Sequence, residues 1–523
     1  MIALQEVKGK LIVATVDGLA EEIMGPFLGH TTIHLHGTNS YLKSIHGSNP
    51  RETPEKILGK EGLRMGPASL NVAGEMIMRG RPSSHSWTTL STTSAVGQTY
   101  IVVEDDVDWK ANDEIIITPT DYDAHQADVK RVVSTAQEGS RTRIELDSAL
   151  EYDHFAGETK MYGTKSMRMQ AKVGLLSRNI VIQGGEGQGE DVPYQRWNSQ
   201  GETLAGTAEC GNLKCEVEET SIGCPSDCRG PAYEFGASIL VASYTVEGVY
   251  CNVNQVCYTD TLRAKQNPVV HMDSVEMRYF GQNNLRAGIE VHQTEKAHIS
   301  NVSLNRGYFH GFSIINCTES RLEDNVFFRT HLPGLRIVGG QSNRVERNLG
   351  ISSIFWNTHP GAIHPSGGLN YIKLSHMIGM FHEFPCDEEL CGRPAMAAAR
   401  HRKRCVPNVF FGTTHWKNNV AAGSERAGFS GIGVSCDGSP SGSFIGNEAV
   451  AALTGYQFDS YHTHRPYLLP IKKVLSCPFE RTCVQLSDFK TWKIRSYGKF
   501  SVIFSLLTTC FQSMKDNSDY PRT

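Results

Sequence analysis

The sequence lacks the features that mark several common classes of protein. Its charge is nearly balanced, with 51 basic and 55 acidic residues and a formal net charge of -4, so we expect no general attraction to nucleic acid. No apolar run reaches the ~20 residues that a membrane-spanning helix requires. No Cys-x-x-Cys pair, phosphate-binding loop or specific nucleophile motif occurs, which argues against a zinc ribbon and against the common motif-bearing enzymes.

The composition that remains favours β-structure and secretion. Glycine contributes 50 of the 523 residues, and Val, Ile and Thr are frequent, which favours strands and turns over helices. Fourteen cysteines indicate disulfides in an extracellular chain rather than metal or redox chemistry. Two Asn-x-Ser/Thr triplets, at Asn301 and Asn316, are candidate glycosylation sites. The disulfide candidates are Cys210, Cys215, Cys224, Cys228, Cys251, Cys257, Cys386 and Cys391.

An internal repeat of 23 residues gives the clearest structural prediction. Apolar residues keep one period across three turns of the chain, and within each turn they alternate with polar residues, as strands do. The columns are Gly288/Gly311/Gly334, Ile289/Phe312/Leu335, Val291/Ile314/Ile337 and Ile299/Leu322/Val345. Short strands repeated at this length predict a right-handed parallel β-helix, in which each coil buries its apolar side chains on the next. Asn325 and Asn348 keep the same period and are interpreted as structural residues of a bend.

The pattern divides the chain into four segments. Residues 1–190 read as short strands joined by turns and form a β-rich domain. Residues 208–230 contain four cysteines and several acids and are predicted to be a small disulfide-stapled insert. The β-helix is assigned to 240–470, with a loop insertion near 386–406. Residues 471–523 are predicted to be an irregular or disordered tail.

Two polar clusters are candidates for chemistry. Asp121, Asp123 and His125, with Asp128, follow a strand and could supply a general acid and base for glycosidic cleavage. The favoured interpretation is a polar turn in which the acids cap backbone amides, so no catalytic residue is assigned. The second cluster has no compact metal-binding spacing and is interpreted as ordinary loop and core histidines. Its members are His359, His364, His376, His382 and Glu383.

No cofactor and no metal site is predicted. Calcium is the alternative for the cysteine-rich insert, but its acids match no known loop spacing; they are Glu216, Glu218, Glu219 and Asp227. The basic run Arg400–Arg404 is interpreted as a solvated loop, with binding of an acidic polysaccharide as its alternative.

Several motifs in the first third of the chain resemble a known family. They are Gly9–Thr15, Pro26–Gly37, Ser86–Leu90, Val107–Ile117, Thr120–Gln126 and Val173–Gly184. Together they resemble the eight-glycine (G-eight) domain of fibrocystin and fibrocystin-like receptors, which the cell-surface hyaluronidases share. The resemblance covers about 9–350 and implies a G-eight domain that leads into β-helix repeats. In that family the domain begins well upstream, with strands that are absent here, so we expect a piece of a longer surface protein; this would also account for the lack of a secretory leader in the first residues.

Three functions from different classes remain open at this stage. The resemblance implies an extracellular, receptor-like ectodomain fragment that binds matrix, carbohydrate or a protein ligand, with membrane attachment only through segments outside this chain. The first alternative is a hyaluronidase-like depolymerase of glycosaminoglycans or other polysaccharides. The second is a purely structural solenoid. The fold cannot decide between them, and the absence of an evident catalytic constellation favours a binding protein over an enzyme.

Overall fold

The computed structural model describes a subset of the chain in which every regular element is a β-strand. The described residues are 5–7, 10–16, 23–35, 68–72, 74–162, 165–184, 236–242, 246–251, 257–262, 268–282, 286–315, 317–331, 333–338, 340–354, 378–383, 414–424, 427–431, 434–435, 443–458, 482–483 and 486–501. Among them, no helix is long and apolar enough to cross a membrane.

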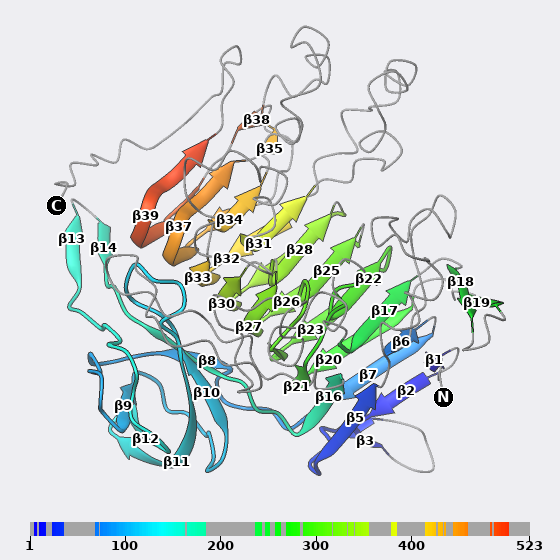
Figure 1. Cartoon of the computed structure of the whole chain (residues 1–523), viewed down its shortest axis with the longest axis horizontal. Coiled ribbons are helices and arrows are strands. Elements are labelled where there is room, and N and C mark those ends of the chain that lie inside the picture. The colour runs from blue at the N-terminus through cyan, green and yellow to red at the C-terminus, as the bar shows by residue number, and fades with distance from the viewer. Residues whose placement is uncertain are drawn as a thin grey trace, which may run out of the picture.

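Three parallel faces wind into a β-helix that runs through the whole molecule (Figure 1). The eight-stranded face contains β2 (Lys10–Val13), β7 (Glu75–Arg79), β20 (Val269–Asp273), β23 (His298–Ser300), β26 (Arg321–Glu323), β29 (Asn343–Glu346), β32 (Thr414–Lys417) and β36 (Phe444–Ile445). The second face contains β5 (Thr31–Leu35), β16 (Ile180–Gly184), β21 (Val275–Arg278), β24 (Ser303–Asn305), β27 (Val326–His331), β30 (Leu349–Ile354) and β33 (Val420–Ser424).

The third face completes each coil. It contains β1 (Gln5–Val7), β6 (Ser69–Val72), β17 (Ser238–Ala242), β22 (Ile289–His292), β25 (Phe312–Ile315), β28 (Leu335–Val338), β31 (Ile378–Glu383) and β34 (Ala427–Gly431). Two long strands, β37 (Glu448–Phe458) and β39 (Lys490–Ser501), continue both the second and the third face.

The 23-residue repeat is confirmed by the register of these strands. Phe312 pairs with Ile289 on one side and with Leu335 on the other. Leu322 likewise pairs with Ile299 and Val345 on the eight-stranded face. All six side chains are buried in one continuous core, because each coil presents the same positions inward and covers the coil before it.

An antiparallel body is inserted into one of the first coils, between β7 and β16. Its six strands lie in the order β8 (Trp87–Thr89), β15 (Lys172–Leu175), β10 (Glu114–Ile117), β11 (Asp128–Glu138), β12 (Arg141–Leu146) and β9 (Tyr100–Val103). It has its own apolar core and lies beside the solenoid (Figure 1). Four separate two-stranded antiparallel sheets are β3 (Thr15–Val16) with β4 (Ile23–Gly25), β13 (Lys160–Tyr162) with β14 (Lys165–Met167), β18 (Val246–Cys251) with β19 (Cys257–Leu262), and β35 (Val434–Ser435) with β38 (Thr482–Cys483).

This arrangement corrects the boundaries drawn from the sequence. The solenoid begins well before residue 240, since β2, β5, β6, β7 and β16 are strands of its coils. The separate β-rich unit is therefore the body between β8 and β15 rather than the whole of 1–190. At the other end, β39 pairs with β37 over much of its length, so 490–501 belong to the β-helix and not to an irregular tail. The insert at 208–230 and the loop at 386–406 lie outside the described residues.

The body is fixed to the second face by apolar contacts. Ile116 and Leu176 pack with Val326, Leu349 and other outward apolar residues of the solenoid in a third core. The fit is tight at Gly174, where an added Cβ would lie 2.9 Å from a methyl carbon of Val326. We call this second face the docking face.

Arg178 joins the body to the solenoid at the point where the chain returns to the coils. Its guanidinium donates to the backbone carbonyls of Asn301 (2.8 Å), Leu175 (3.0 Å) and Ser177 (2.8 Å). Burial lowers the pKa of Arg178 to about 10, while Glu276 is the largest opposing influence. The group is still charged at neutral pH, and its hydrogen bonds to backbone carbonyls offset part of the cost of burying it.

The corner between the eight-stranded face and the docking face repeats in the coils from β20 to β36. One residue adopts positive φ, as at Asn301 (53°), Asp324 (55°) and Arg347 (51°). In four coils the next residue is a fully buried asparagine, and these form a ladder: Asn325, Asn348, Asn419 and Asn447. Successive side chains bond Nδ2 to Oδ1 at 2.8, 2.9 and 2.9 Å. The structural interpretation of Asn325 and Asn348 is confirmed.

We expect Asn348→Ala to destabilise the chain by about 2–4 kcal/mol. Asn348 accepts from the Asn325 backbone amide and side chain, and it donates to Leu322 O and Asn419 Oδ1. The substitution leaves these buried groups without partners. Urea unfolding measures the change, with the exposed Gln341→Ala as the control within ~0.5 kcal/mol of wild type. Equal midpoints for the two variants would contradict the structural role of the ladder.

Candidate functional site: a cation column on the eight-stranded face

Five cationic or titratable side chains stand in one outward-facing column of the eight-stranded face. Strand register places His271, His298, Arg321, Arg344 and His415 opposite one another on five successive coils. The residue after each is buried in or against the core: Met272, Ile299, Leu322, Val345 and Trp416. Because side chains alternate along a strand, the column must point away from that core. We call these five residues the cation column.

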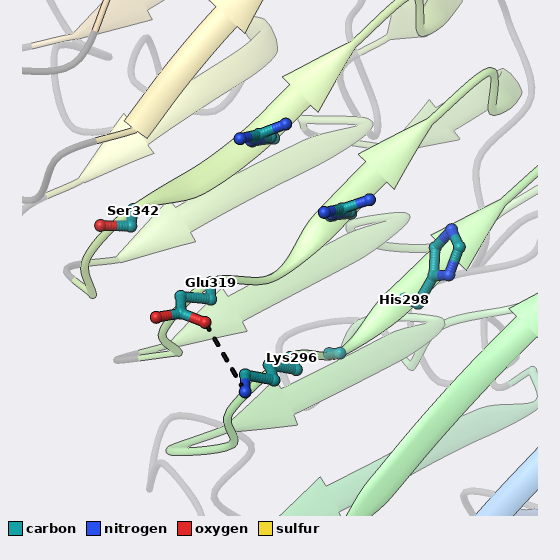
Figure 2. A pocket seen from close by; sticks show the side chains of 7 residues that line it. Lys296, His298, Glu319 and Ser342 are labelled. Atoms are coloured by element: carbon teal, nitrogen blue, oxygen red, sulfur yellow. Dashed lines mark ion pairs between the residues drawn. The ribbon is translucent and has the colours of Figure 1, made fainter.

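A surface pocket of about 430 Å³ lies along the middle of the cation column. It is lined by Lys296, Ala297, His298, Glu319, Arg321, Ser342 and Arg344, which come from equivalent positions of three consecutive coils. Figure 2 shows His298 at one end of this row, with Lys296, Glu319 and Ser342 along its edge. The lining has no Phe, Tyr or Trp side chain, so the site offers charge and hydrogen bonds rather than an aromatic stacking surface.

The pocket carries uncompensated positive charge. Its single carboxylate, Glu319, faces Lys296 at 3.9 Å, and both side chains are exposed. Arg321 and Arg344 are exposed register partners, and neither guanidinium has an ion pair or hydrogen bond to another described residue. Like charges directly opposite on neighbouring strands destabilise a sheet. Two stacked arginines are therefore costly unless an anion lies over them.

The histidine end of the column contributes less permanent charge. The rings of His271 and His298 lie 4.9 Å apart at 37°. Burial lowers the pKa of His271, and nearby Arg79 and His298 add to this effect against Asp273. His271 is therefore neutral at pH 7, and the two arginines provide the fixed charge of the column.

Carboxylates border the pocket on the side that faces the corner with the docking face. Asp273, Ser300, Glu323 and Glu346 form a neighbouring column on β20 to β29, two residues further along each strand, and three of these four side chains are carboxylates. Asp273 accepts hydrogen bonds from Asn301 (3.0 Å) and Ser274 (3.1 Å), and Glu346 lies 3.7 Å from Arg347. An anionic ligand is therefore confined to the pocket side of the cation column.

The acids singled out from the sequence are divided between two structural roles. Asp121 is exposed and pairs with Lys493 of β39 at 3.0 Å; burial alone would raise the pKa of Asp121, but the Lys493 hydrogen bond helps to lower it overall. Asp123 accepts from the backbone amide of His125 at 3.0 Å, as in a polar turn. The segment fastens the body to the end of the solenoid, since Arg495 also donates to Tyr122 O.

Asp128 lies inside the body rather than in a cleft. Its Oδ2 is 2.9 Å from His154 Nε2, and it accepts from the backbone amides of Glu151 and Tyr152. Burial would raise the pKa of Asp128, but the hydrogen bond to His154 and the neighbouring amides lower it. Asp128 is thus a capping residue for a loop of the body and does not join Asp121 in a catalytic site.

Most cysteine, histidine and calcium candidates lie outside the described residues. These are Cys210, Cys215, Cys224, Cys228, Cys386, Cys391, Glu216, Glu218, Glu219, Asp227, His359, His364, His376 and the basic run 400–404. Cys251 and Cys257 are Cα partners in a hairpin, and a disulfide between them stays a prediction. His382 and Glu383 belong to β31. In the described part of the chain, no three His, Cys, Asp or Glu side chains gather as a metal site.

Asn301 has a structural role in this fold. Its Nδ2, the atom to which a glycan would be attached, donates to Asp273, and its Oδ1 accepts from Ser86 of the body at 2.8 Å. Glycosylation at Asn301 stays a prediction and would break the first of these bonds. Asn316 lies outside the described residues, while its neighbour Cys317 is a buried free thiol whose pKa is raised by burial.

A second polar cluster lies on the third face. Glu290 Oε1 is 2.7 Å from His292 Nε2, and both side chains are mostly buried. Burial would raise the pKa of Glu290, but the hydrogen bond to His292 and the charges of Arg286 and Arg336 lower it. This carboxyl is therefore a charged acceptor for its neighbours rather than a poised proton donor.

Comparison with known proteins supplies the family. No family model matches the chain. Human fibrocystin-L is 26% identical over 408 residues, covering 74% of this chain and 8% of the relative. A G8 domain-containing protein of Dictyostelium discoideum is 29% identical over 158 residues, covering 30% of this chain and 10% of the relative. The chain thus spans less than a tenth of the length of fibrocystin-L.

Solved structures add little beyond this. The tailspike of Acinetobacter baumannii bacteriophage AP22, in complex with capsular saccharide, is 9% identical, with a TM-score of 0.20 over 89% of this chain and 73% of that chain. A TM-score this low does not establish a shared fold. The β-helix is established by the strand pairing of this chain itself. The sequence matches, together with the motifs that run from Gly9 to Gly184, support a G8-domain, fibrocystin-like family for this chain, at modest sequence identity.

Proposed function

We propose that this chain is part of the ectodomain of a receptor-like surface protein and that its cation column binds an acidic polysaccharide outside the cell. Similarity to the fibrocystin-like family and the fourteen cysteines support the extracellular placement. The observation that supports an anionic ligand is the stacking of Arg321 on Arg344 in a pocket whose only carboxylate already faces Lys296.

The pocket favours an anionic sugar polymer over the other ligands considered. Guanidinium groups recognise carboxylate and sulfate oxygens through paired hydrogen bonds. A neutral sugar would leave the repulsion between the two arginines in place. A nucleic acid would meet a chain with a net charge of -4 and a row of carboxylates beside the pocket. A polymer whose acidic groups recur at intervals matches cations that recur from coil to coil.

We expect Arg321→Ala and Arg344→Ala each to weaken binding of heparin by about fivefold at low salt, and the double variant by more than tenfold. Each substitution removes one positive charge that no described residue neutralises. Binding is measured by fluorescence polarisation with labelled heparin, and neutral dextran serves as the ligand control.

Arg347→Ala is the matched protein control for these variants. Arg347 is an exposed arginine three residues after Arg344, but it is paired with Asp324 at 2.7 Å and lies at the corner, outside the column. Its removal should leave heparin binding within about twofold of wild type. An equal loss of heparin affinity in all three single variants would mean that heparin binds to general surface charge and not specifically to the cation column.

One observation favours a polysaccharide-cleaving activity as the second candidate. Glu323 and Glu346 are register partners beside the pocket, and neighbouring strands lie ~4.8 Å apart. Retaining glycosidases hold two carboxyl groups at about 5–5.5 Å. Glu346, however, already faces Arg347 at 3.7 Å, so its carboxylate has a partner within the protein.

We therefore expect hyaluronan and chondroitin to keep their size after incubation with the purified chain. Size-exclusion chromatography with light scattering measures the polymer before and after incubation. Shortening of either polymer that is abolished by Glu346→Gln, but not by Asp123→Asn in the turn of the body, would identify the chain as an enzyme. Such a result would replace the binding proposal.

A further inference from the structure

The cation column runs along the axis of the solenoid, not across it. Its five members occupy equivalent positions on β20, β23, β26, β29 and β32, which are neighbours in the sheet. With neighbouring strands ~4.8 Å apart, four steps place His271 and His415 roughly 19 Å apart. Arg344 and His415 are neighbours in this row although 70 residues separate them in the sequence.

The path across the coils is short and blocked at one end. The outward positions of β23 and β26 lie between two corners with positive φ, at Lys296 (60°) and Asn301 (53°) in one coil and at Glu319 (54°) and Asp324 (55°) in the next. A polymer that followed the strand direction would leave the face within a few residues. On one side it would meet the row of Glu323 and Glu346, so it would contact the cations of about one coil only.

The path along the axis has the opposite properties. The pocket takes its lining from the same positions of three consecutive coils, so it is already elongated in that direction. Glu323 and Glu346 stand side by side, parallel to Arg321 and Arg344, and would line the ligand on one side without crossing its path. Within the five coils of the cation column, each coil adds one titratable or cationic side chain.

We propose that the acidic polysaccharide lies parallel to the solenoid axis, with successive anionic groups over successive coils of the cation column. This inference rests on the proposed function and adds the orientation and minimum length of the ligand. Arg321 and Arg344 hold the centre of every bound chain. The histidines at the two ends contact only those chains that are long enough to reach them.

The test is a length series of heparin-derived oligosaccharides, from tetrasaccharide to dodecasaccharide, with the full chain at pH 6, where ordinary histidines carry partial charge. We expect affinity to rise with length and to level off once the column is covered. The salt dependence of binding should steepen over the same range, because more cations are neutralised.

Substitution at the end of the cation column distinguishes an oligosaccharide that lies along the solenoid axis from one that is held only by general charge attraction. His415→Ala should weaken the dodecasaccharide by about threefold and leave the tetrasaccharide unchanged, whereas Arg321→Ala should weaken both. Lys417→Ala is the matched control, since Lys417 lies on the same strand but in the neighbouring column; it should change neither affinity. Circular dichroism and thermal unfolding verify that each variant is folded.

The outcomes distinguish the two proposals. Failure of every oligosaccharide and of heparin to bind would overturn the proposed function itself. Binding that does not depend on length, or an equal loss for short and long oligosaccharides in His415→Ala, would overturn the axial orientation and leave the binding site standing. A length-dependent loss confined to the long oligosaccharides supports both.

Discussion

The corner between the eight-stranded face and the docking face fixes the register of the whole solenoid. From β20 to β36, each coil turns there through a residue with positive φ, and most of these residues are not glycine. Such a conformation costs an ordinary L-residue roughly 1–2 kcal/mol. The buried ladder from Asn325 to Asn447 offsets this cost, since each asparagine bonds the next and satisfies backbone groups of the coil before it.

The same corner determines where the cation column stands. Arg321, Arg344 and His415 each lie four residues before a ladder asparagine, at Asn325, Asn348 and Asn419. A shift of one residue in any strand would turn its cation into the core and expose an apolar side chain. The ladder therefore holds the charges in step from one coil to the next. The antiparallel body occupies the docking face through its apolar contacts, whereas Arg321 and Arg344 on the eight-stranded face are exposed.

The sequence predicted the β-helix because its inward residues repeat at a constant interval. It placed Ile289, Phe312 and Leu335 in one column, and they are consecutive partners in the sheet. The first coils escaped notice because the strands of one coil, β7 and β16, are separated by the whole antiparallel body. No constant period survives an insertion of that size, so the solenoid was drawn too short and the first domain too long.

The candidate site was missed for a related reason. A search for chemistry along the sequence favours compact motifs, and Asp121, Asp123 and His125 are close together in the chain. The structure uses Asp121 and Asp123 in a turn and in an ion pair with β39. Arg321 and Arg344 are 23 residues apart, and only the fold brings them together. The available signal was the cation four residues before each periodic asparagine.

If the ligand binds to the eight-stranded face, whose register the asparagine ladder sets, the strands of that face should be protected when the ligand is present. Amide hydrogen–deuterium exchange with and without saturating heparin measures this protection. We expect added protection in peptides covering 296–300, 319–323 and 342–346, with unchanged exchange in the body loop 119–127 and in β22 on the third face. Protection confined to the body loop or the third face, with none on the eight-stranded face, would contradict this binding site.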